Sequence, residues 1–214
     1  MPVQSSFGIC QLCESRVGKG AMLAHLQKCL AERGGSKASP ALLIRAQAVG
    51  APMYWLCFAV KPSATLENLD TYLRGIWLEC CGHLSEFYFI LGEEVSMSKK
   101  VHAILDEVGT RINYIYDWGS STELVVRLER EVVAAPDKRV CLVARNEPPT
   151  WKCDECDEVA TMVCTECHSE GDGFCCPVHA ETHECGEDML LPVVNSPRMG
   201  VCAYEGDEGE EGEE

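Results

Sequence analysis

The chain has 214 residues, of which 46% are apolar and 15 are cysteine, and its formal net charge is −16. No run approaches the roughly 18 consecutive apolar residues that a membrane span needs, and residues 1–11 lack the charged and apolar regions of a signal peptide. We therefore expect a cytoplasmic protein without a membrane segment, whose reduced cysteines bind metal or pack in cores instead of forming disulfides.

Charge is distributed unevenly along the chain. Residues 1–45 hold six basic and two acidic side chains, whereas residues 151–204 hold two basic and eleven acidic ones, and seven more acids follow in 205–214. Affinity for nucleic acid comes mainly from Lys and Arg. Any DNA or RNA contact is therefore expected only through residues 1–45.

The first 32 residues carry a pattern typical of a small zinc finger, with one pair of donors at Cys10 and Cys13 and a second pair at His25 and Cys29. His25 and Cys29 are four positions apart, so both lie on one face of a helix and reach the same ion. A segment this short has too few apolar residues for a core of its own. We expect zinc binding to stabilise its fold.

The run C-x2-C-x3-V-x7-H-L-x2-C-L over residues 10–30 resembles the C2HC zinc fingers of the ubiquitin-binding DNA-repair type. It departs from them at Gln11, where that family usually has proline. The resemblance implies a ββα finger. If this finger docks on a protein, its helix is expected to expose apolar side chains near Met22 and Leu26. A Gly/Ser/Pro cluster follows, and residues 33–50 are predicted to be a linker.

Between residues 51 and 148, apolar runs with strand spacing alternate with helical ones. The predicted helices begin at Thr65 and at Lys99, and the predicted strands cover residues 54–60, 86–91, 112–116, 123–131 and 140–144. The fold class is therefore α+β: a small antiparallel sheet with helices on one face, flanked by the N-terminal finger and a C-terminal cross-braced zinc module.

Three short runs in this domain, ATLENL at 64–69, HLSEF at 83–87 and YIYDWG at 114–119, resemble the plasmid pRiA4b ORF-three-like family, also described as transposon-passenger-like. The resemblance covers about residues 50–145. Trp118 replaces the usual Phe, and Ser120–Thr122 replace the acidic-aromatic continuation. The family has no assigned activity, so the resemblance implies a fold and an association with mobile elements but no reaction.

Two places in the central domain carry residues that also occur in catalytic sites. Cys80, Cys81 and His83 place two thiols near an imidazole, which is compatible with a nucleophile or with metal binding. The helical apolar spacing instead favours a structural, buried Cys80. Asp117 can act as a general acid or base, but an aspartate shortly before a glycine is typical of a turn.

The C-terminal module, residues 149–204, is dense in cysteine and histidine. Two C-x2-C pairs are followed by a mixed group, and together they supply the eight donors that two tetrahedral zinc ions need. The predicted donors are Cys153, Cys156, Cys164, Cys167, Cys176, His179, His183 and Cys185. With the N-terminal finger, this predicts about three zinc ions per chain.

The order of these donors resembles that of a B-box or a similar cross-braced module. The resemblance implies that Cys153, Cys156, Cys176 and His179 share one ion and that Cys164, Cys167, His183 and Cys185 share the other. Cys175 and Cys202 remain alternatives to Cys185. The acidic tail, residues 205–214, is predicted to be disordered because it has nothing to bury.

Three functions are compatible with these features. The favoured one is a non-enzymatic zinc-binding adaptor that acts through protein–protein interaction, because a site filled by four protein ligands leaves no position for water or substrate. The second is a nucleic-acid-binding accessory protein of a mobile element that uses the basic N-terminal finger. The third is an enzyme with a Cys/His site in the central domain.

Overall fold

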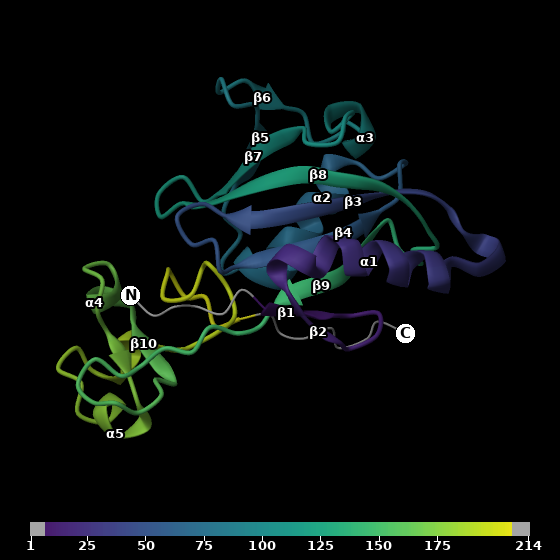
Figure 1. Ribbon diagram of the computed structural model, residues 1–214. Helices are drawn as coiled ribbons and strands as arrows, with labels where there is room; N and C mark the ends of the chain where they lie inside the picture. The colour runs from purple at the N-terminus through teal and green to yellow at the C-terminus, as the bar shows by residue number, and fades with distance from the viewer. Residues whose placement is uncertain (1–6, 207–214) are drawn as a thin grey trace. The chain divides into compact units, whose positions relative to one another are not determined.

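The computed structural model describes residues 7–206 (Figure 1). The chain divides into two compact units. Unit 1 is Met1–Leu73 with Leu84–Glu147, and unit 2 is Arg74–His83 with Pro148–Glu214. The acidic tail that was predicted to be disordered lies, from residue 207 onward, outside the described residues.

Unit 1 is built on one antiparallel sheet of nine strands. All five strands predicted for the central domain are present in it, and the sheet is larger than the small one expected. In spatial order the strands are β2 (Arg16–Gly18), β1 (Phe7–Cys10), β9 (Val140–Asn146), β4 (Trp55–Val60), β3 (Ser39–Ala48), β8 (Thr122–Ala134), β7 (Arg111–Tyr116), β5 (Ser85–Tyr88) and β6 (Glu94–Val95).

The linker predicted for residues 33–50 is wrong, because β3 lies in the middle of the sheet. It pairs with β4 on one side and with β8 on the other. Leu43 and Ile44 are fully buried in it. The Gly/Ser/Pro cluster forms the approach to this strand, where η1 (Gly35–Lys37) makes one 3-10 turn, and its last residues, Ser39 and Pro40, begin β3.

The N-terminal ββα elements are part of unit 1 and not a separate body. β1 pairs with β9, with Gly8 opposite Asn146, and α1 (Lys19–Gly34) packs on the sheet. Met22 and Leu26 are 1% and 0% exposed and share a core cluster with Trp55 of β4. The expectation that they form an exposed docking face is therefore wrong, because the sheet already covers them.

Helices cover both faces of the sheet, which corrects the expectation of one face. Cys57 and Ala59 of β4 face the core cluster beneath α1. Phe58, between them, points to the opposite face and meets Tyr72 of α2 (Leu66–Leu73) edge-on, with ring centroids 5.4 Å apart. Figure 1 shows α1 in front of the sheet and α2 behind it. β4 is consequently buried along its whole length. The second predicted helix is reduced to a single turn, α3 (Val101–Ile104).

Unit 2 has little regular structure. It contains the π-helical turn η2 (Arg74–Leu78) and a three-stranded sheet in the order β11 (Phe174–Cys175), β10 (Met162–Cys164), β12 (Leu190–Pro192), with the short helical turns α4 (Thr165–His168), α5 (Pro177–Ala180) and η3 (Glu187–Met189).

The apolar core beside the three-stranded sheet of unit 2 is small. Val163, Phe174 and Met199 belong to a cluster of only five buried residues among those described, and Trp151 stacks on Phe174 at 4.5 Å between ring centroids. After β12 the chain has no further strand among the described residues, and residues 201–203 form a bend and turn. Such a core needs other stabilising interactions, as small metal-binding modules do.

Across residues 7–206, no helix combines the length and the apolar character needed to cross a membrane.

Candidate metal centres

The N-terminal cluster forms where β1 ends and α1 passes over the following turn. The Cys10 N–H donates to the carbonyl of Ser15 at 3.0 Å, which closes the turn that carries Cys13. His25 and Cys29 project from α1 into the same place. Cys13 Sγ lies 3.3 Å from His25 Nε2 and 3.6 Å from Cys29 Sγ, and Cys29 Sγ lies 3.4 Å from the same nitrogen.

The thiols of this cluster have different electrostatic surroundings. The hydroxyl and backbone N–H of Ser15 lower the pKa of Cys13 to about 6. Burial raises the pKa of Cys29 to about 12. Thiolate is the form that binds metal, so Cys13 already favours the ligating form at neutral pH, whereas Cys29 needs a nearby cation to reach it.

The second cluster joins a loop to a helical turn in unit 2. Cys153 and Cys156 come from the loop, Cys176 precedes α5, and His179 lies in α5. His179 Nδ1 is 3.3 Å from the sulfurs of Cys153 and Cys176 and 3.5 Å from that of Cys156. The other ring nitrogen, Nε2, lies 3.8 Å from a carboxylate oxygen of Glu155, which is beyond hydrogen-bond distance.

The third cluster uses the opposite end of the same unit. Cys164 ends β10, Cys167 lies in α4, and His183 and Cys185 come from the loop after α5. Cys167 Sγ is 3.5 Å from His183 Nε2 and 3.7 Å from Cys185 Sγ. The chain returns past Cys167 at Gly173, whose positive φ of 99° and close contacts leave no room for a side chain.

The geometry distinguishes Cys185 from the two alternatives left open by the sequence. The sulfur of Cys175 lies 3.8 Å from His183 Nδ1, on the side of the ring away from the cluster. It is buried, and burial raises its pKa to about 11. Cys202 belongs to a different group of donors. Cys185 is therefore the cysteine that completes the third cluster.

The three predicted sets fit zinc in number, kind and spacing of donors. Each brings three sulfurs and one imidazole nitrogen within 4.8 Å of one another. Ligands at the usual Zn–S and Zn–N distances of a tetrahedral site lie about 3.5–3.8 Å apart, close to the distances found here. The structure thus brings together all twelve predicted donors in the predicted sets, while zinc ligation by them remains a prediction.

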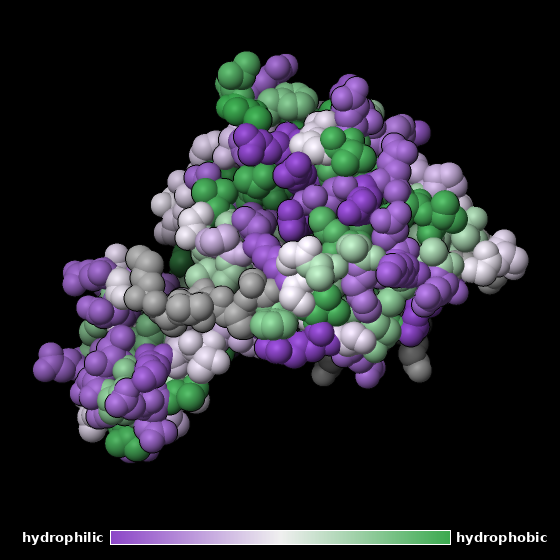
Figure 2. All heavy atoms as spheres, in the orientation of Figure 1, coloured by the Kyte–Doolittle hydropathy of each residue, from purple (hydrophilic) through white to green (hydrophobic). Residues whose placement is uncertain are grey.

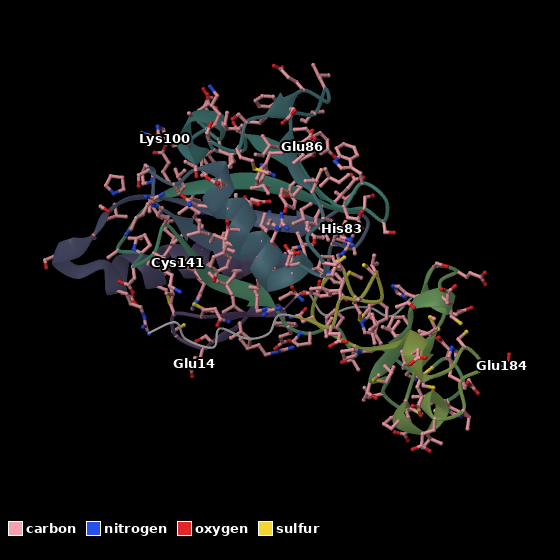
Figure 3. All side chains as sticks on the ribbon, turned by 180° about the vertical axis from the view of Figure 1, so that it is seen from behind. Glu14, His83, Glu86, Lys100, Cys141 and Glu184 are labelled. Carbon is pink, nitrogen blue, oxygen red and sulfur yellow. The ribbon has the colours of Figure 1, made fainter. Side chains whose placement is uncertain are left out.

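A fourth group of the same composition is present in unit 2: Cys80, Cys81, His83 and Cys202. The prediction of a buried Cys80 is wrong, because Cys80 is only partly buried and Cys81 is exposed. α2 ends at Leu73, so the apolar spacing does not continue as an α-helix to Cys80. Figure 3 labels His83, whose ring lies beside sulfur atoms. The sequence had offered Cys80, Cys81 and His83 as one possible metal site, and it had offered Cys202 only as an alternative donor to the third cluster.

Asp117 occupies a turn, as its neighbours in the sequence favoured. It follows β7 with a positive φ of 63°, and its Oδ1 accepts the N–H of Gly119 at 2.9 Å. This is the local hydrogen bond that aspartate makes in tight turns. The carboxylate therefore has a structural role between β7 and β8.

Comparison with protein-family models finds no match to the chain, and comparison with curated proteins finds none either. A solved structure from Methanosarcina mazei Go1, described as a protein of unknown function, is 18% identical, covers 52% of this chain and 69% of that chain, and has a TM-score of 0.41. Similarity at this level supports no conclusion about the fold or the function of this chain. The pRiA4b ORF-three-like, C2HC and B-box-like resemblances therefore remain predictions.

Proposed function

We propose that this protein is a non-enzymatic, zinc-binding adaptor that acts through protein–protein interaction. The observation that supports it most is the composition of the Cys/His clusters. Each supplies four protein donors to one point, and a zinc ion held by four protein ligands has no open position for water or substrate. Zinc in such sites stabilises a fold and presents its surface, and does not activate a nucleophile.

The charged side chains of the N-terminal region favour an adaptor over a nucleic-acid-binding protein. Arg16 pairs with Glu147 at 2.5 Å, and Arg45 pairs with Glu129 at the same distance. Lys19 is partly buried and donates to the carbonyl of Pro52 at 2.7 Å. Half of the six basic residues in 1–45 are thus engaged within the protein, which reduces the positive field available to phosphates.

An exposed apolar pair supplies a candidate contact for a protein partner. Ile90 and Leu91 lie at the tip of the β5–β6 hairpin and are 61% and 97% exposed. Figure 2 shows hydrophobic side chains gathered at this hairpin. Contiguous exposed apolar surface marks protein-binding sites, whereas single exposed apolar side chains are common on any surface. We therefore place the adaptor contact at this hairpin.

The test is affinity capture with the full chain as bait. Wild-type protein is compared with the double variant Ile90→Ser/Leu91→Ser and with the control Val108→Ser, which removes another exposed apolar side chain, 62% exposed. We expect a protein that is retained by wild type and by the control, survives a high-salt wash, and is lost from the double variant. Retention of nucleic acid that disappears with salt would support the accessory-factor alternative instead. Equal retention of one protein by all three baits would place the contact elsewhere on the surface.

A further inference from the structure

The group formed by Cys80, Cys81, His83 and Cys202 has the dimensions of a metal site. Cys81 Sγ lies 3.0 Å from His83 Nε2, 3.5 Å from Cys202 Sγ and 3.7 Å from Cys80 Sγ, and Cys202 Sγ lies 3.7 Å from His83 Nε2. Three of these distances fall within the range found in the predicted clusters, and the Cys81–His83 distance is shorter. The Sγ atoms of Cys81 and Cys202 are too far apart for a disulfide, whose S–S bond is about 2.05 Å long.

Two residues with left-handed backbone direct these donors to one point. Gly82 has φ 81° and turns the chain between Cys81 and His83, so that both side chains reach the same side. Its N–H donates to a carboxylate oxygen of Glu79 at 2.7 Å, which holds the turn. Cys202 has φ 56°, an uncommon conformation for a residue with a side chain. Such conformations occur where the surrounding structure requires them.

A buried cation lies next to the sulfurs. The Arg198 side chain is fully buried, and its Nη2 donates to Cys80 Sγ at 3.5 Å. Three thiolates and a neutral imidazole around a divalent ion carry one net negative charge, which a guanidinium complements. Donors of this kind around metal-bound ligands stabilise the thiolate form.

Hydrogen bonds within unit 2 hold the two parts of the group together independently of any ion. Trp77 Nε1 donates to the carbonyl of Asn195 at 3.0 Å, and Ser196 Oγ donates to the carbonyl of Trp77 at 2.6 Å. The Tyr204 hydroxyl donates to the carbonyl of Ile76 at 3.4 Å. Residues on both sides of Cys202 are therefore anchored to the segment that leads into Cys80.

We propose that Cys80, Cys81, His83 and Cys202 bind a fourth zinc ion, which ties the segment 74–83 to the C-terminal part of unit 2. Three sulfurs and one imidazole nitrogen are the donors of structural zinc sites. The chain enters unit 2 at Arg74 and leaves it at His83, so this ion adds a further link to the hydrogen bonds that already join the segment to the rest of the unit. The site goes beyond the proposed function, which stands with the three other clusters alone.

The test is the zinc content of the full chain, purified under reducing conditions without added metal and measured by elemental analysis and native mass spectrometry. We expect four zinc ions in wild type and three in the double variant Cys81→Ser/Cys202→Ser. Cys141→Ser is the matched control, because Cys141 lies outside the four groups, and it should keep four. Cobalt substitution should show the loss of one thiolate-rich site in the double variant only.

A second pair of variants keeps the test decisive if the double variant fails to fold. His83→Cys preserves a four-donor site and should bind four ions, whereas His83→Ala should bind three. Three ions in wild type, or four in the double variant, would overturn the proposal. A Cys81–Cys202 disulfide, found by mass spectrometry in protein purified under reducing conditions, would also overturn the proposal. These results leave the proposed adaptor function unchanged, because it rests on the three other clusters and is tested separately by partner capture.

Discussion

Cys81 and Cys202 are 121 positions apart in the chain, yet their sulfurs lie 3.5 Å apart in unit 2. The candidate donor clusters therefore differ in how far apart their residues lie in the sequence. The three predicted clusters gather residues from nearby segments. The widest separation between two contacting donors is the 26 positions from Cys153 to His179. The fourth depends on the packing of the whole unit.

Gly8→Ala should destabilise the N-terminal edge of the sheet. A Cβ at Gly8 would lie 2.4 Å from the carbonyl oxygen of Arg145 and from the Trp55 ring, both of which are held in place by the sheet. Overpacking of this kind costs about 1–3 kcal/mol. Urea denaturation measures the change, and Gly18→Ala is the control, because its nearest neighbour would be 3.9 Å away. Equal midpoints for the two variants would mean that β1 is not tightly packed against β4.

Leu26→Ala should lower the free energy of unfolding of unit 1 by about 2–5 kcal/mol, because it leaves a cavity in a buried core. Leu26 is fully buried between α1 and the sheet. The neighbouring exposed residue gives the control, Gln27→Ala, which should change stability little. The measurement is thermal or chemical unfolding followed by circular dichroism. A small effect of Leu26→Ala would restore the view of the N-terminal finger as a separate module.

Gly173→Ala should remove one zinc ion, the one held by the third cluster. Its Cβ would approach Cys167 Cβ to 2.9 Å and the carbonyl oxygen of Cys164 to 3.1 Å, which displaces two ligands. Gly171→Ala is a close control, because Gly171 has nearly the same positive φ but no neighbour within 4 Å. Both variants share the backbone strain, so only the steric conflict differs. Zinc content of the purified variants decides between them, and equal losses would assign the effect to strain alone.

Removal of zinc by a chelator should affect the two units differently. The apolar core of unit 2 is small, so metal loss should unfold it, as in other small zinc modules. In unit 1, α1 retains its packing on the sheet through Met22 and Leu26, so only the turn at residues 11–15 and β2 should lose protection. Hydrogen exchange with and without chelator measures both responses. Complete loss of protection in α1 would show that zinc, and not the core, holds this helix.

The full chain should show no measurable binding to duplex DNA at about 0.15 M salt. Its net charge is −16, and Arg16 and Arg45 are paired with carboxylates. Fluorescence anisotropy with labelled duplex and single strands measures this directly. A tight, salt-sensitive complex would favour the accessory-factor function. The logarithm of its affinity should then fall by about 0.9 for each neutralised phosphate when the salt concentration rises tenfold.

Much of the candidate chemistry follows from local spacing. A C-x2-C pair places two sulfurs on one turn, and His25 and Cys29 share a helix face, so these donors converge wherever the segment lies in the fold. The same holds for Cys176 and His179 at the start of α5. Local spacing therefore predicted the donors, whereas the division of the C-terminal donors into two sets came from the B-box-like resemblance. The structure brings the donors together in the same sets.

The arrangement of the elements could not be predicted in this way. Residues 39–48 were assigned to a linker because the Gly/Ser/Pro cluster runs into them, yet their pairing with β4 and β8 makes them a central strand. Helices on both faces of the sheet follow from the pairing of β1 with β9, which brings α1 over β4. Pairing partners so distant in the chain leave no local pattern.

The sequence by itself identified the twelve Cys and His residues that the structure brings together in three clusters, because each pair of donors is positioned by a short stretch of backbone. Only the tertiary structure decided that Met22 and Leu26 are core residues, that Cys175 faces away from the third cluster, and that Cys80, Cys81, His83 and Cys202 form a fourth. These outcomes depend on which distant segments pack together. That packing is determined by the burial of apolar side chains across the whole unit, and no single spacing in the sequence encodes it.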